Sequence, residues 1–183
     1  MKRVMSIFTL FSLLAVLCFL PGCGYKLGLT GMDKPYKNIY CYTVVNETRK
    51  PGLEMPMTNA IIDAFHHYGG SIKIVTSKEE ADAFMLVKLT RFVRSPARFD
   101  DADFLEESSV SLYAELFLYP YDLDPRESDI QQNALVKPIY HVNFAESATY
   151  FLEPNQPEGE RSILPQLYDK ISREIVSLVV ERW

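Results

Sequence analysis

The sequence predicts an α+β fold: a two-layer sandwich in which a mixed sheet of four to five strands carries two helices packed on one face. Residues 109–119 alternate between an apolar set and a second set with a period of two, which is typical of an antiparallel strand with one core face. Residues 53–68 and 162–182 each carry one apolar stripe at helical spacing. Because two one-sided helices need one sheet face to cover, the opposite face is expected to stay uncovered.

The expected order of elements is β-α-β-β-β-β-α, and turn residues mark its first half. Residues 38–45 are β-branched and aromatic, as in a strand, and the polar loop after them contains the turn signal Pro51-Gly52. Pro56 is tolerated only in the first turn of a helix, so the helix is expected to begin near Met55 or Pro56. Gly69-Gly70 ends it, since glycine takes the left-handed position after a helix without a Cβ clash.

Two further strands are expected before the alternating one. Residues 72–75 form a short strand, and residues 84–93 form a long strand whose first four residues are apolar on both faces, as in the centre of a sheet. The polar stretch 94–107 contains Pro96 and five acids, and it is expected to be the loop of a hairpin.

The last third of the chain is expected to add one strand and one helix. Residues 139–151 follow the proline-containing loop 120–138. Their alternation places three apolar side chains on one face, those of Tyr140, Val142 and Phe144. The final helix is expected to use Ser162 as its N-cap and to confine Pro165 to its first turn.

Composition limits the classes of function. The 183 residues contain 24 acids and 19 bases, for a formal net charge of −5. A general nucleic-acid binder is disfavoured, because neutralising phosphates requires a basic surface. The apolar fraction of 48% is ordinary for a globular protein and excludes wholesale disorder.

The first 22 residues are predicted to be a lipoprotein signal peptide. Lys2 and Arg3 precede an uncharged apolar run over residues 4–20, and Leu20-Pro21-Gly22-Cys23 resembles the bacterial lipobox, with Pro21 as a departure from its usual residue. Cys23 is then the lipid attachment site. The alternative is a retained membrane helix, but this run of 17 residues is shorter than the ~20 that typically span a bilayer.

Cleavage before Cys23 removes 22 residues and two positive charges, which leaves 161 residues with a net charge of −7. Residues 23–36 are expected to form a tether and residues 37–183 the folded domain. More than one acyl chain makes anchoring stable, and Gly24 is typical of an outer-membrane address in some bacteria. Cys18 leaves with the signal peptide, so Cys41 is expected to be a small buried thiol without a disulfide partner, in preference to a catalytic cysteine.

Catalytic and metal-binding motifs are missing from the sequence. It contains no G-x-S-x-G elbow and no H-E-x-x-H pair. His66 and His67 are adjacent on a helix and point about 100° apart, so they form a poor metal pair. Asp122-x-Asp124 lacks the glycine and the glutamate of a calcium loop. We therefore expect no enzyme activity, no metal and no cofactor; an unrecognised lipid-modifying hydrolase is a distant alternative.

Four bases without an intervening acid occupy residues 88–98; they are Lys88, Arg91, Arg94 and Arg98. Strict strand alternation predicts that Lys88 and Arg94 share one face and that Arg91 lies on the other. In one interpretation these bases bind the phosphates or carboxylates of a lipid head group. In the other they belong to a solvated hairpin and balance the acids that follow.

The first half of the chain also carries a series of short motifs. They are Cys23-Gly24-Tyr25-Lys26-Leu27-x-Leu29-x-Gly31, Ile39-x-x-x-x-Val44-Val45-Asn46-Glu47-Thr48, Pro51-Gly52-Leu53-Glu54-x-x-x-Thr58-x-Ala60 and Glu80-Ala81-Asp82-Ala83. In this order and spacing they resemble the lipopolysaccharide-assembly lipoprotein family, LptE. The resemblance covers residues 20–95, and the remainder matches by element order.

This resemblance implies a sheet with two packed helices, tethered to the outer membrane, that plugs the lumen of a large β-barrel translocon subunit, LptD. An uncovered sheet face bearing Tyr113, Phe117 and Tyr119 suits such an interface, because these aromatic residues include polar tips. The family is also thought to bind lipopolysaccharide through basic residues. In a chain with a net charge of −7, that binding depends on a local patch such as residues 88–98.

Two functions remain open from the sequence. The first is a non-enzymatic assembly and plug subunit for lipopolysaccharide export. The second is another outer-membrane-anchored periplasmic adaptor, such as an activator of peptidoglycan synthesis, which would have soluble periplasmic partners.

Overall fold

The computed structural model describes residues 36–126, 137–152 and 159–182. The chain divides into two compact units, residues 1–32 and 33–183, and the described residues all belong to the second. The predicted signal peptide, Cys23 and nearly all of the tether therefore lie outside the described residues. Within the described part of the chain, no helix is both long and apolar enough to cross a membrane.

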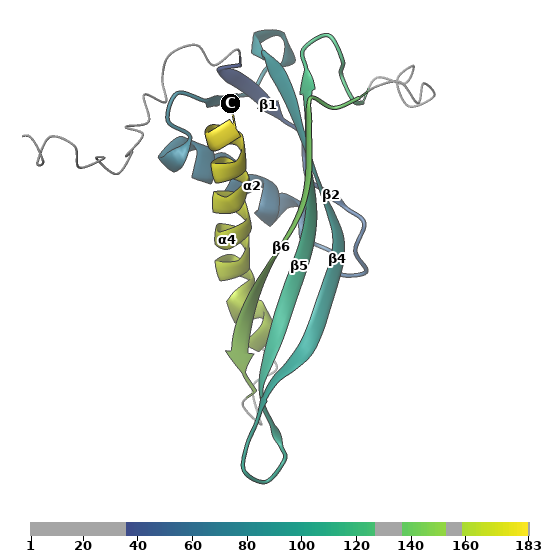
Figure 1. Cartoon of the computed structure of the whole chain (residues 1–183), viewed down its shortest axis with the longest axis vertical. Coiled ribbons are helices and arrows are strands. Elements are labelled where there is room, and N and C mark those ends of the chain that lie inside the picture. The colour runs from purple at the N-terminus through teal and green to yellow at the C-terminus, as the bar shows by residue number, and fades with distance from the viewer. Residues whose placement is uncertain (1–35, 127–136, 153–158, 183) are drawn as a thin grey trace, which may run out of the picture. The chain divides into compact units, whose positions relative to one another are not determined.

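The fold is α+β, as predicted, with a mixed sheet and two long helices (Figure 1). The elements are β1 (Asn38–Cys41), β2 (Val45–Asn46), α2 (Glu54–Tyr68), β3 (Lys73–Val75), the 3₁₀ turn η1 (Lys78–Glu80), β4 (Ala83–Phe99), β5 (Leu105–Pro120), β6 (Tyr140–Phe151) and α4 (Gly159–Arg182). The strands run in the order β3-β1-β4-β5-β6, and β2 pairs with β4. Strands β1 and β2 are parallel to β4, β1 is parallel to β3, and the β4–β5 and β5–β6 pairs are antiparallel.

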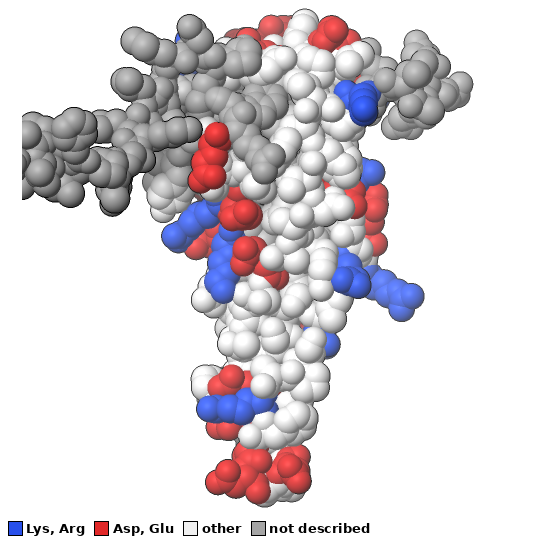
Figure 2. All heavy atoms as spheres, in the orientation of Figure 1, with Lys and Arg blue, Asp and Glu red and all other residues white. Residues whose placement is uncertain are grey.

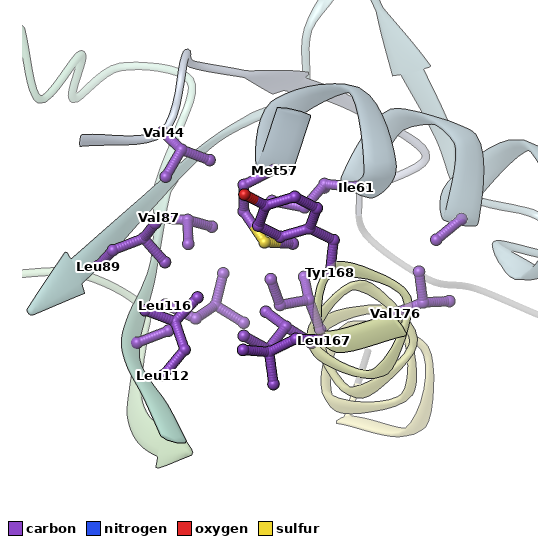
Figure 3. Close-up of a cluster of buried hydrophobic side chains, with 14 of the residues drawn as sticks. Val44, Met57, Ile61, Val87, Leu89, Leu112, Leu116, Leu167, Tyr168 and Val176 are labelled. Atoms are coloured by element: carbon purple, nitrogen blue, oxygen red, sulfur yellow. The ribbon is translucent and has the colours of Figure 1, made fainter. Parts of the chain in front are cut away.

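Helices α2 and α4 pack on the same face of the sheet and enclose the main hydrophobic core (Figure 1). The alternation predicted for β5 is confirmed, because its even-numbered residues from Val110 to Leu118 are buried and the odd-numbered ones between them are half-buried. Figure 3 shows the side chains of Leu112 and Leu116 directed toward Leu167 on α4. The predicted core face of β6 also packs against this core, through Tyr140, Val142 and Phe144.

Helix α2 has the boundaries that its sequence predicts. It begins at Glu54, which places Pro56 in the first turn. It ends before Gly69, and the left-handed position is taken by Gly70, whose φ is +62°. The single strand predicted over residues 38–45 is instead interrupted at Tyr42, so that it forms β1 and β2.

Helix α4 begins earlier than its sequence predicts. Its first residue is Gly159, so Ser162 is not the N-cap and Pro165 lies beyond the first turn. Ile163 is buried in the core with 4% exposure. Glu160 forms ion pairs with Lys50 and Arg94. Burial and charge pairing together hold this extra turn, although proline removes one of its backbone hydrogen bonds.

The predicted hairpin loop at 94–107 is wrong, because most of that stretch is strand. Strand β4 continues to Phe99 and β5 begins at Leu105, so the loop spans only residues 100–104. Asp100 Oδ1 accepts hydrogen bonds from two backbone amides inside this short loop. Pro96 lies opposite Ser108, next to a register irregularity, where a missing ladder donor is tolerated. Figure 2 shows acidic side chains gathered over this end of the hairpin.

Replacing Leu112 with alanine should lower the free energy of unfolding by about 2–5 kcal/mol, because a fully buried core side chain leaves a cavity. Ser111→Ala, the neighbour on the opposite face, should change it by less than about 0.5 kcal/mol. Denaturant unfolding of the full chain in detergent measures both. Equal losses for the two variants would contradict the assignment of the two faces of β5.

Candidate docking face of the sheet

We call the sheet face that points away from both helices the outer face. Strand β5 contributes its odd-numbered side chains to this face, among them Tyr113, Glu115, Phe117 and Tyr119. The ladder places Lys88 of β4 opposite Glu115 and His141 of β6 opposite Phe117. The three aromatic residues that the sequence predicts for an exposed face therefore do lie on it, and each is half-buried.

Phe117 lies at the centre of a stacked group on the outer face. The His141 ring lies parallel to it, with a centroid distance of 4.3 Å and an interplanar angle of 6°. The Tyr119 ring is also nearly parallel to it, with a centroid distance of 6.4 Å and an interplanar angle of 18°. The Lys88 ammonium lies 5.6 Å from the Phe117 centroid, within the range of a cation–π contact. The group therefore combines apolar area with polar and charged edges.

A β-bulge at Thr90 reverses the predicted arrangement of the basic residues. Leu89 pairs with Ala114 and Arg91 pairs with Tyr113, so Thr90 is the extra residue and the alternation of β4 shifts by one. Arg91 thus shares the outer face with Lys88, and its guanidinium lies 3.8 Å from the centroid of the Tyr113 ring.

Arg94, predicted to share a face with Lys88, lies instead on the helix face of the sheet. It pairs in the ladder with Val110, a core residue, and forms an ion pair with Glu160 of α4. Arg98 pairs with Glu106 and Glu107 at 3.1 and 3.0 Å. Its ladder partner Glu107 is an odd-numbered residue of β5, so Arg98 faces the outer side at the hairpin end of the sheet. The four bases of residues 88–98 therefore do not converge on one site, and Lys88 and Arg91 lie next to each other on the outer face.

A groove follows the bulge on the outer face, with a volume of about 570 Å³. Its polar lining comes from three strands, because Arg91 lies on β4, Glu115 on β5 and Asn143 on β6. Tyr113 supplies an aromatic wall. His141 Nε2 lies 3.9 Å from Glu115 beside the groove. Donors, acceptors and aromatic area thus occur together there, as in the contact surfaces of many proteins.

Residues 120–126 cover another part of the outer face, a feature that the sequence analysis missed. Asp124, expected only as a residue of the proline-containing loop 120–138, is 6% exposed and accepts a hydrogen bond from the Tyr42 hydroxyl. Its other oxygen pairs with Lys78 at 2.6 Å. Arg126 donates to the Thr43 carbonyl at 2.9 Å. These contacts hold residues 120–126 against Tyr42.

The charges around Asp124 shift several pKa values. Burial and the hydrogen bond to Asp124 raise the pKa of Tyr42 to about 12. The hydrogen bond to Asp124 also raises the pKa of Lys78. For Asp124, burial acts to raise the pKa, but hydrogen bonds from Lys78, Tyr42 and the Arg126 amide outweigh it and hold the pKa below its usual value. At neutral pH, Asp124 is therefore a carboxylate and Lys78 an ammonium, and the two form an ion pair.

The motifs that resemble LptE have structural roles here. The Asn46 side chain donates to the Lys50 carbonyl and to Glu54, and it accepts a bond from the Thr48 amide, so it organises the loop before α2. Thr58 Oγ1 accepts from the Val44 amide at 3.0 Å. Asp82 accepts from the backbone amides at the start of β1.

Two further expectations concern reactive groups. Cys41 packs against the main core, and burial raises the pKa of its thiol to about 12, which disfavours the nucleophilic thiolate. Among residues 36–126, 137–152 and 159–182, no group of three or more histidine, cysteine or acidic side chains could hold a metal ion.

Comparisons with known proteins give structural likenesses of low identity. No family model matches the sequence. No curated protein matches it either. A hypothetical protein from Chlamydia trachomatis aligns over 79% of this chain and 95% of its own, with 12% identity and a TM-score of 0.49. A minor lipoprotein from Acinetobacter baumannii covers 80% and 94%, with 9% identity and a TM-score of 0.49. Rare lipoprotein B from Shewanella oneidensis covers 77% and 92%, with 10% identity and a TM-score of 0.40.

The Asp124 cluster predicts a stability loss in acid. Because the folded-state pKa lies below the usual 3.8, Asp124 stabilises the fold above that value, and the contribution disappears as pH falls through the lowered pKa. Asp124→Asn should cost about 1–2 kcal/mol at pH 7 and flatten the decline in stability as pH falls below the usual 3.8.

Denaturant unfolding of the full chain in detergent at several pH values measures both effects. Asp122→Asn, an exposed acid two residues away, is the matched control and should behave like the original chain. An equal pH dependence for the original chain and the Asp124 variant would contradict the role given to this carboxylate.

Proposed function

We propose that this chain is a lipid-anchored outer-membrane lipoprotein that assembles with a β-barrel translocon subunit of the LptD type and plugs its lumen, in lipopolysaccharide transport to the cell surface. The lipobox-like Leu20-Pro21-Gly22-Cys23 supports the anchor, with acyl chains on Cys23. The motifs over residues 20–95 support the family. The role is one of assembly and does not require catalysis.

The observation that carries the proposal is the composition of the outer face. A solvent-facing side of an antiparallel sheet normally bears polar residues, whereas this one bears Tyr113, Phe117 and Tyr119 in half-buried positions. Half-buried aromatic side chains gain further burial when a partner covers them, and the hydroxyls of Tyr113 and Tyr119 can form hydrogen bonds at the edge of the contact.

The polar groups of the outer face favour a barrel lumen as the partner surface. The interior of an outer-membrane barrel is polar, so a purely apolar plug surface would leave the lumen's polar groups unpaired. Here Lys88, Glu115 and His141 border the aromatic group and can pair across such an interface. Burial of the aromatic rings then contributes most of the binding free energy, and the charged groups beside them fix how the two surfaces align.

Direct lipopolysaccharide binding is a secondary part of the proposal. Lys88 and Arg91 are neighbouring bases on the outer face, whereas Arg98, farther along the same side, is paired with Glu106 and Glu107. Lys88 has a partner in Glu47 at 3.4 Å, and Arg91 stacks on Tyr113. We therefore rank partnering with the barrel above binding of lipopolysaccharide phosphates.

Replacing Cys23 with serine should abolish acylation, because serine lacks the thiol that forms the thioether. Incorporation of labelled palmitate into the immunoprecipitated chain measures this directly. Cys18→Ser is the matched control and should keep the label. A Cys23→Ser variant that still takes up palmitate would rule out this attachment site.

Extraction of the membrane with mild detergent should recover the chain together with a barrel protein of several hundred residues, identified by mass spectrometry. The double variant Tyr113→Ser/Phe117→Ser should lower that recovery by at least tenfold, since it removes two central aromatic contacts. Met55→Ser/Tyr68→Ser is the matched control, because both side chains are exposed on α2, in the helix layer.

Three outcomes would contradict the proposal. Recovery of a free lipoprotein contradicts it directly. Soluble periplasmic partners, with cell-wall defects and intact lipopolysaccharide, would favour the anchored adaptor. Equal losses of barrel recovery in the two double variants would mean that the outer face is not the contact surface.

A further inference from the structure

A second group of bases lies on the helix side of the sheet, away from the outer face. It lines a pocket of about 450 Å³ formed by Arg49, Lys50, Pro51, Phe92 and Arg94. Three of these five residues are cations, although the chain as a whole is acidic. A local excess of positive charge on an acidic body is a feature that an anionic ligand would recognise.

One anion, the side chain of Glu160, pairs with two of the cations that line the pocket. That side chain is 12% exposed, and its two oxygens pair separately with Lys50 and Arg94. One carboxylate is thus set against the three cations Arg49, Lys50 and Arg94, and these four side chains together carry a net charge of +2.

Lys50 is held in place by the protein's own contacts. Asn46 Nδ2 donates to the Lys50 carbonyl at 2.8 Å, and the Lys50 amide donates to Thr48 Oγ1 at 3.2 Å. The Lys50 ammonium lies 5.3 Å from the centroid of the Phe92 ring, which forms an apolar wall of the pocket. A preorganised cation costs less entropy on binding than a free surface lysine.

We infer that this pocket binds a phosphoryl group, in exchange for the Glu160 carboxylate. A phosphate monoester carries a charge of about −1.5 to −2 at pH 7, so it neutralises the three cations better than one carboxylate does. Two arginines offer planar forks for its oxygens, and Lys50 supplies a point charge. Glu160 acts as a built-in competitor that weakens binding until a ligand displaces it.

Glu160 can leave the pocket without disturbing the core. It is the second residue of α4, and the next two residues, Arg161 and Ser162, are exposed. The first residue of the helix that is buried in the core is Ile163. The inference does not rest on the barrel proposal, because the pocket and the outer face lie on opposite sides of the sheet.

The test titrates the full chain in neutral detergent with two probes, inorganic phosphate and the short-chain lipid dihexanoyl phosphatidic acid, by calorimetry. Glu160→Gln should bind the preferred probe on the order of tenfold more tightly than the original chain, because the competing charge is gone. Lys50→Gln/Arg94→Gln should bind it at least tenfold more weakly. Arg98→Gln, a base of the same strand outside the pocket, is the control and should bind unchanged.

The two probes distinguish the source of the ligand. Equal affinity for both supports a site for the phosphoryl group itself, and binding of the lipid alone supports a lipid head group. A gain of affinity in Glu160→Gln cannot arise from loss of folding, so this variant keeps the test decisive. The inference is overturned if Glu160→Gln binds neither probe more tightly than the original chain does.

Discussion

The two-sided use of strand β5 is the constraint on which the rest of the structure depends. Each of its side chains must suit one of two opposite environments, because neighbouring residues of a strand point to opposite faces. Its even-numbered side chains, such as Leu112 and Leu116, are fully buried beneath α2 and α4. Its odd-numbered ones form the centre of the outer face. A shift of the register by one residue would exchange the two sets and remove both the core and the candidate docking face.

The sequence predicts the elements that follow a regular period, and it fails where pairing between distant segments decides. The alternation of β5 and the apolar stripes of both helices need no tertiary information, and both are confirmed. The bulge at Thr90 is different, because it is defined only against β5, and it moves Arg91 and Arg94 to faces opposite to those that strict alternation assigns. The strand over residues 94–99 was missed for the same reason: its polar residues are stabilised by a partner strand.

Charged side chains were the least predictable part of the candidate sites. The sequence places Asp124 in a proline-containing loop, and only the fold brings Tyr42 and Lys78 to it. Glu160 likewise pairs with Lys50, which lies 110 residues earlier in the chain. The motifs that resemble LptE mark hydrogen bonds of the scaffold, such as those of Asn46 and Asp82, so they indicate the fold more directly than they indicate a binding surface.

The central claim is that the outer face of the sheet contacts a barrel partner while the helix layer does not. Site-specific photo-crosslinking in living cells tests it most directly, with the crosslinking amino acid placed at the position of Phe117 or of Tyr68. The account predicts a crosslink from position 117 to an outer-membrane β-barrel protein and none from position 68. A barrel crosslink from position 68 with none from position 117 would contradict it.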